Sequence, residues 1–107
     1  MKYEVFLLSD AEEDILEIFN YVSNYDSSTN AIKLVSEFEK ACINLAKFPD
    51  RGHVPPELER IGVYDFKEIQ YKPYIIIYRI IDKFVYVYCI IDCHRNLGDL
   101  LEKRLLR

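Results

Sequence analysis

The sequence predicts an α+β fold of order βααβββα, in which a helical hairpin packs on a mostly antiparallel sheet and a short helix ends the chain. Three observations lead to this prediction. Two amphipathic segments at helical spacing, residues 9–25 and 30–48, are joined by a short polar loop. The second half holds three β-prone segments, and residues 96–107 repeat leucine at helical spacing.

The first half begins with an apolar, β-prone stretch at residues 3–8, which predicts a strand. Ser9 and Glu12 then form a capping-box pattern at the expected start of the first helix, which ends near Tyr25. The polar residues 26–30 separate it from a second helix. We expect Phe48-Pro49 to close this helix, because the residue before a proline is pushed out of the α region.

Residues 49–62 contain glycines and a proline pair without a regular period, which predicts a loop. Strands follow at residues 63–70, 74–81 and 84–92, and Asp82-Lys83 forms a tight turn between the last two. The strand at 74–81 begins with residues that are apolar on both faces, so we expect it to be central and covered on both sides. The helices are nevertheless expected on one side of the sheet, and Asn96 is expected to cap the last one.

Length and composition indicate a single globular domain over residues 1–107. The chain has a mass of 12.7 kDa, with 50% hydrophobic and 30% charged residues. Arg79 and Asp82 interrupt the longest apolar run, so no membrane-spanning helix is expected. The N-terminal residues do not resemble a secretory signal, and we expect a cytoplasmic protein with reduced cysteines.

The charge is unevenly distributed. Residues 1–50 carry 4 basic and 10 acidic side chains, whereas residues 51–107 carry 10 basic and 8 acidic ones. A net charge of −4 argues against avid binding of nucleic acid over the whole surface, because such binding depends on neutralising phosphates. Any contact with a polyanion is expected to be local and confined to the second half.

Three cysteines and two histidines are candidates for chemistry. Cys89, Cys93 and His94, with Cys42 as a fourth ligand, would suit zinc, but four strand residues place Cys89 and Cys93 about 13 Å apart. We therefore expect buried, inert thiols, with neither a metal nor a cofactor. His53 and His94 are candidate general bases. His94 is favoured because Arg95 follows it where a strand meets a helix start.

Several motifs in order carry a resemblance to a known family. They are Phe48-Pro49-Asp50-Arg51-Gly52-His53, Pro56-Glu57-Leu58, Lys72-Pro73-Tyr74-Ile75-Ile76-Ile77-Tyr78, Asp92-Cys93-His94-Arg95-Asn96-Leu97, Leu100-Leu101 and Arg104-Leu105-Leu106. In these motifs and in element order, the whole chain resembles the RelE/ParE superfamily of toxins from bacterial type II toxin–antitoxin pairs.

The resemblance implies two alternative mechanisms. RelE-like toxins cut messenger RNA on the ribosome with basic residues on the sheet and a tyrosine or histidine near the C-terminus. In that case Arg95, His94 and Lys67 would be catalytic here, but Ile75 stands where such toxins usually carry arginine and Glu68 stands at another basic position. Leu100 and Leu101 occupy the final helix where an acid or base would be expected. These departures favour the ParE-like branch, which acts by binding a protein such as DNA gyrase.

The resemblance also implies a partner. An antitoxin with a disordered tail would wrap the toxin and keep it inactive. The expected assembly is a homodimer or a toxin–antitoxin hetero-oligomer. The expected contacts are the helix hairpin and a patch of Arg79, His94 and Arg95. Lys72, Tyr74, Arg79 and His53 are the candidate binding residues. A degenerate toxin, retained as a binding module, is a third alternative.

Overall fold

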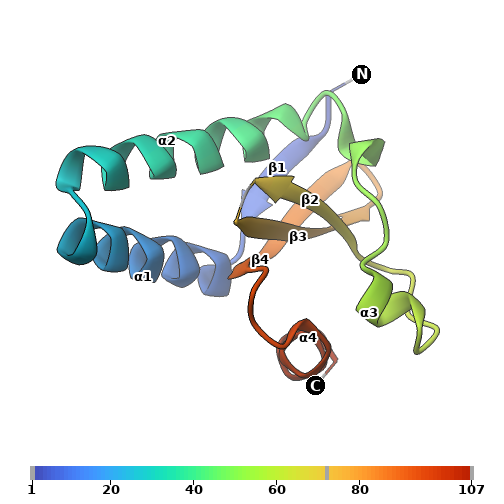
Figure 1. The fold of residues 1–107 in the computed structure, drawn as a ribbon. Helices are drawn as coiled ribbons and strands as arrows, with labels where there is room; N and C mark the ends of the chain where they lie inside the picture. Colours follow the sequence, from blue (N-terminus) through green and yellow to red (C-terminus); the bar gives the residue numbers. More distant parts are fainter. Residues whose placement is uncertain (1, 72, 107) are drawn as a thin grey trace.

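The computed structural model describes residues 2–71 and 73–106 of the chain. Its elements are β1 (Glu4–Leu7), α1 (Ser9–Tyr25), α2 (Ser28–Asn44), the 3₁₀ helix η1 (Pro49–Arg51), α3 (Pro56–Glu59), β2 (Lys67–Tyr71), β3 (Tyr74–Ile81), β4 (Phe84–Asp92) and α4 (Leu97–Leu105). Figure 1 shows α1 and α2 as an antiparallel hairpin beside the sheet. This arrangement confirms the predicted α+β fold.

The four strands lie in the order β1-β4-β3-β2. β1 runs parallel to β4, while the β2–β3 and β3–β4 pairs are antiparallel. The β3–β4 hairpin turns at Asp82, whose φ of 56° is the left-handed conformation that such tight turns require. A β-bulge shifts the β3–β4 register between Ile77 and Tyr78. Because β3 lies between β4 and β2, it is a central strand, as the sequence predicted.

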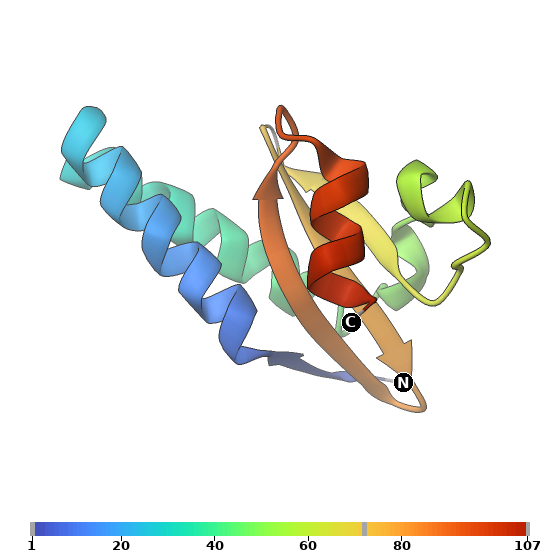
Figure 2. The ribbon, with the colours of Figure 1, turned by 90° about the horizontal axis from the view of Figure 1, so that it is seen from below.

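Two apolar cores lie on opposite faces of the sheet. One contains Ile76 and Tyr78 of β3 with the apolar sides of α1 and α2, and the other contains Ile75 and Ile77 with Leu58 of α3 and Leu101 of α4. Figure 2 shows α4 lying across the face of β4. The expectation that the helices share one side is thus wrong. A central strand that is apolar on both faces needs cover on both, and α3 and α4 supply the second cover.

The start of α1 and the end of α2 differ from the sequence prediction. Ser9 is already helical, and Leu8 is the N-cap without a side-chain cap, because its amide bonds to Val87 of β4 and keeps it extended. The regular part of α2 ends at Asn44, and bonds of the i→i+3 type tighten the chain as far as Lys47. Asn96, in contrast, caps α4 as predicted by accepting a hydrogen bond from the Asp99 amide.

The predicted loop at residues 49–62 contains two short helices instead. η1 and α3 begin at Pro49 and Pro56, and proline suits the first helical position because its φ is fixed and its missing N–H is not needed there. β2 is also shorter than predicted and begins at Lys67, although Phe66 before it is buried in the second core.

Gly52 lets the η1 segment approach the sheet. The buried Tyr78 hydroxyl donates a hydrogen bond to the Pro49 carbonyl at 2.6 Å and accepts one from the Gly52 amide at 3.0 Å. A Cβ atom on Gly52 would lie 2.6 Å from both this hydroxyl and the Glu68 carbonyl oxygen. The Phe-Pro-Asp-Arg-Gly-His motif therefore has a structural role, since it closes the chain over the end of the first core.

We predict that Gly52→Ala lowers the free energy of unfolding by about 1–3 kcal/mol, because the backbone must move to relieve the overlap. Urea denaturation measures the change. Gly98→Ala is the matched control, since a Cβ there lies 3.7 Å from its nearest neighbour and helix α4 gains from alanine. Equal effects of the two substitutions would contradict the proposed close approach.

Candidate functional site

A cavity of about 350 Å³ opens between α1, the end of β4 and α4. Its lining combines acidic, basic, aromatic and aliphatic side chains, namely Asp14, Glu17, Ile18, Tyr21, Tyr74, Ile90, Ile91, Asp92, Arg95, Leu100 and Arg104. Three carboxylates face two guanidinium groups in this set. The cavity is therefore mixed in charge and does not form a cationic cleft.

Asp14 ties the three elements of the cavity together. Its Oδ2 accepts hydrogen bonds from the Ile90 amide and from Arg104 Nη2, both at 2.9 Å, and its Oδ1 accepts from Arg104 Nη1 at 3.3 Å. β1 pairs with residues 84–87 of β4, so the later part of β4 faces α1. Asp14 on α1 therefore supplies the acceptor for the Ile90 amide. A forked, part-buried ion pair of this kind fixes orientation as well as adding energy.

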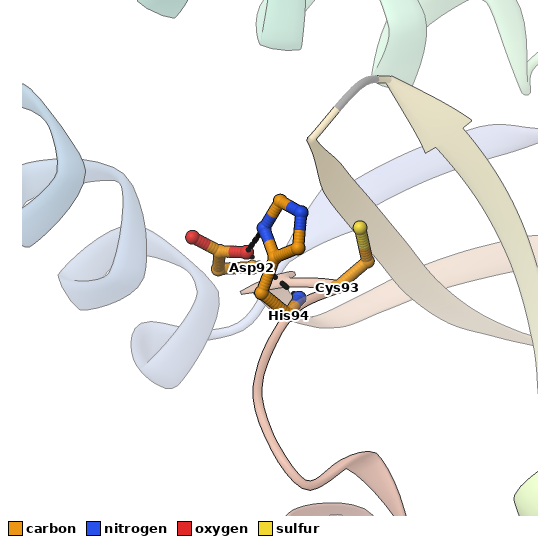
Figure 3. A group of neighbouring side chains, drawn as sticks. All are labelled: Asp92, Cys93 and His94. Atoms are coloured by element: carbon orange, nitrogen blue, oxygen red, sulfur yellow. Dashed lines mark hydrogen bonds and ion pairs between the residues drawn. The ribbon is translucent and has the colours of Figure 1, made fainter.

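The turn after β4 forms the rim of the cavity. Asp92 Oδ1 accepts hydrogen bonds from the backbone amide and from Nδ1 of His94, both at 2.9 Å (Figure 3). The hydrogen bond from the His94 backbone amide, together with the His94 ring, holds the pKa of the Asp92 carboxyl below its ordinary value. This geometry fixes the His94 ring beside a carboxylate while most of the side chain stays exposed.

The structure brings together some of the predicted site residues and separates others. Tyr74 and Arg95 line the cavity, and His94 lies in the adjoining turn. Arg79 pairs with Tyr86, whereas Tyr74 pairs with Asp92, so Arg79 lies about 16 Å along the strand from this rim. Arg79 therefore does not form one patch with His94 and Arg95, and the role of these residues in binding a partner stays a prediction.

The other predicted cations lie elsewhere. Arg79 places its guanidinium 5.8 Å from the ring centroid of Phe66. Lys67 lies on β2 opposite Tyr78. Its side chain starts on the same face of the sheet as that of Ile69, because side chains alternate along a strand. Lys72 lies outside the described residues. Lys67 and Arg79 thus point to opposite faces of the sheet.

His53 belongs to a separate cluster at the β2 edge. Its backbone forms a bridge with Glu68, and its Nε2 lies 3.2 Å from Glu68 Oε2. The pKa of the Glu68 carboxyl lies above its ordinary value, mainly because the group is buried. The charge on His53 lowers this pKa, whereas the charge on Glu57 raises it. Oε1 of each glutamate is buried and lacks a hydrogen-bond partner within residues 2–71 and 73–106. We assign this cluster to the attachment of α3 and the preceding segment to the sheet.

Sequence reasoning missed Asp14, Tyr21 and Arg104. The acidic residues of α1 were expected to form a solvated face, and nothing in their spacing sets Asp14 apart from Glu13 or Glu17. Asp14 differs only because the end of β4 and α4 pack beside it. Such a partner becomes visible only in three dimensions.

The cysteines are distributed over both cores and the rim. Cys42 lies in the core under the hairpin and Cys89 in the core under α4, where burial raises their thiol pKa values to about 11 and about 12. These two confirm the expectation of buried thiols. Cys93 is half-buried in the turn beside His94 and is unlike them.

No helix in the part of the chain that the structure describes is long and apolar enough to cross a membrane. Among solved structures, the chain is similar to the chromosomal ParDE toxin–antitoxin system from P. aeruginosa, with a TM-score of 0.71 and 15% identity over 85% of this chain and 96% of that one. It is also similar to the toxin–antitoxin complex RelBE2 from Mycobacterium tuberculosis, with a TM-score of 0.65 and 16% identity over 86% and 99% of the two chains. These likenesses concern the fold.

A search of the curated proteins found no match. The profile of one protein family does match, over residues 5–97, and that family is described as the ParE toxin of the type II toxin–antitoxin system parDE. The match spans both helices of the hairpin, the sheet and the turn that holds His94 and Arg95. The chain therefore belongs to the ParE toxin family, within the RelE/ParE superfamily of type II toxin–antitoxin systems.

Proposed function

We propose that this toxin arrests growth by binding a protein target, as the ParE-like branch does with DNA gyrase, and that a cognate antitoxin neutralises it. The observation that carries the first part is the burial of Ile75. This residue is 3% exposed and packs in the second core with Leu58 of α3 and Leu101 of α4. The position where RelE-like toxins usually carry an arginine is thus part of an apolar core.

The distribution of charge supports the same proposal. Cleavage of RNA through its 2′-hydroxyl requires cations that stabilise a charged transition state and groups that transfer protons. Lys67 and Arg79 point to opposite faces of the sheet, Arg95 lies in the turn after β4, and Arg79 packs against Phe66. A toxin that acts by binding needs no such constellation.

A second candidate function, messenger RNA cleavage on the ribosome, has one observation in its favour. His94 Nδ1 donates a hydrogen bond to the Asp92 carboxylate, which leaves Nε2 of this largely exposed side chain available next to Arg95. A histidine oriented by a carboxylate is a suitable general base. This pair is the reason to test for cleavage directly.

We predict that inducing the toxin gene alone stops growth and that the purified toxin inhibits DNA supercoiling by gyrase. Messenger RNA on translating ribosomes is expected to stay intact. Both assays use the same preparation, and the Arg95→Ala variant serves as the control for cleavage.

Cleavage that is lost in Arg95→Ala would contradict the binding proposal and favour the nuclease. Growth arrest without an effect on gyrase or on messenger RNA would keep the binding mechanism but remove gyrase as its target. Unimpaired growth would favour a degenerate toxin retained as a binding module.

The cavity between α1, β4 and α4 is the proposed antitoxin site. It combines an apolar lining from Ile18, Tyr21 and Leu100 with the charged groups of its rim, so an amphipathic segment of a partner suits it. Family membership and the likeness to structures of toxin–antitoxin complexes support such a partner.

We predict that Tyr21→Ala weakens antitoxin binding by about tenfold or more, because exposed tyrosines at such sites often dominate affinity. Isothermal titration calorimetry with the co-encoded antitoxin measures the change. Tyr64→Ala is the matched control, since Tyr21 and Tyr64 are 64% and 62% exposed but only Tyr21 lines the cavity. Equal affinities for the two variants would show that the antitoxin binds elsewhere.

A further inference from the structure

The turn after β4 collects three side chains of different chemistry. Asp92, Cys93 and His94 each offer one ligand atom, and these atoms all lie within 4.8 Å of one another. Figure 3 shows the carboxylate, the thiol and the imidazole around one bend of the chain. Cys89, four strand residues before Cys93, does not belong to this cluster.

The backbone of this turn is held in place on both sides. The Cys93 amide donates to the Pro73 carbonyl at 2.8 Å, and the Arg95 amide donates to the Asp92 carbonyl at 3.2 Å. The first bond attaches the turn to the residue before β3, and the second closes the turn itself. The three side chains therefore start from a fixed backbone, and only their own rotations are needed to converge.

The distances suit a small tetrahedral ion. Four-coordinate zinc, with bonds of about 2.0–2.3 Å, holds its ligand atoms roughly 3.5 Å apart. Asp92 Oδ1 and His94 Nδ1 are already 2.9 Å apart, and the remaining pairs lie within 4.8 Å. The His94 and Asp92 side chains are 79% and 41% exposed, so they can move by about an ångström and a hydrated ion can reach them.

The donor set selects the class of ion. A thiolate and an imidazole favour zinc and related first-row ions such as cobalt, whereas magnesium and calcium prefer oxygen ligands alone. The ion would take the place of the proton between Asp92 and His94, and the Cys93 thiol would lose its proton on binding. Three protein ligands leave a fourth position for water or for a group of a bound partner.

We propose that Asp92, Cys93 and His94 form a three-ligand site for Zn²⁺ or a similar divalent first-row ion at the rim of the cavity. This site is independent of the target on which the toxin acts. Asp92 and Arg95 both line the cavity, so the ion site adjoins the proposed antitoxin site.

The test is a titration of the full-length, reduced and chelator-treated protein with Co²⁺. We expect one ion per chain, a thiolate-to-cobalt charge-transfer band in the near ultraviolet, and loss of this band when Zn²⁺ is added. Cys93→Ser should abolish the band. Cys93→Ser and His94→Gln should each weaken Co²⁺ binding by about tenfold or more.

Cys42→Ala is the matched control, because this thiol is buried in the opposite core and should leave the band unchanged. His94→Gln changes an exposed side chain and so separates loss of a ligand from loss of folding. The absence of a charge-transfer band, its persistence in Cys93→Ser, or unchanged Co²⁺ affinity in His94→Gln would overturn the proposal.

Discussion

The burial of β3 on both faces is the constraint on which the rest of the structure depends. Ile75 and Ile77 point to one core and Ile76 and Tyr78 to the other, so neither face of the strand can be left in water. The hairpin of α1 and α2 covers the first face, and α3 and α4 cover the second. The η1 segment completes the first core, where Gly52 and Pro49 close over the Tyr78 hydroxyl.

This constraint also supports the proposed mechanism. Ile75, at the position where RelE-like toxins usually carry an arginine, belongs to an apolar core. Polar chemistry is displaced to the edges of the sheet. It gathers at the end of β4, where Asp14 and Arg104 tie α1 to α4 and where the turn holds Asp92, Cys93 and His94.

Much of the fold could be predicted from the sequence because local patterns determine it. β3 and β4 occupy the predicted residues 74–81 and 84–92, and Asn96 caps α4, since strand propensity and capping act over a few neighbours. The face that α4 covers, the contact of Gly52 with Tyr78 and the role of Asp14 join residues far apart in the sequence. A single sequence carries no local signal for such contacts. The convergence of Asp92, Cys93 and His94 likewise carries no signal in the sequence, because it depends on the bend that follows β4.

The substitution Ile75→Arg tests the central claim most directly. If this position lies in an apolar core, the buried charge should lower the free energy of unfolding by more than about 3 kcal/mol, measured by urea denaturation. Ile81→Arg places the same charge on the same face of β3, where the native side chain is 39% exposed, and should cost far less. An Ile75→Arg protein as stable as the wild type, with new activity against messenger RNA on ribosomes, would contradict the account.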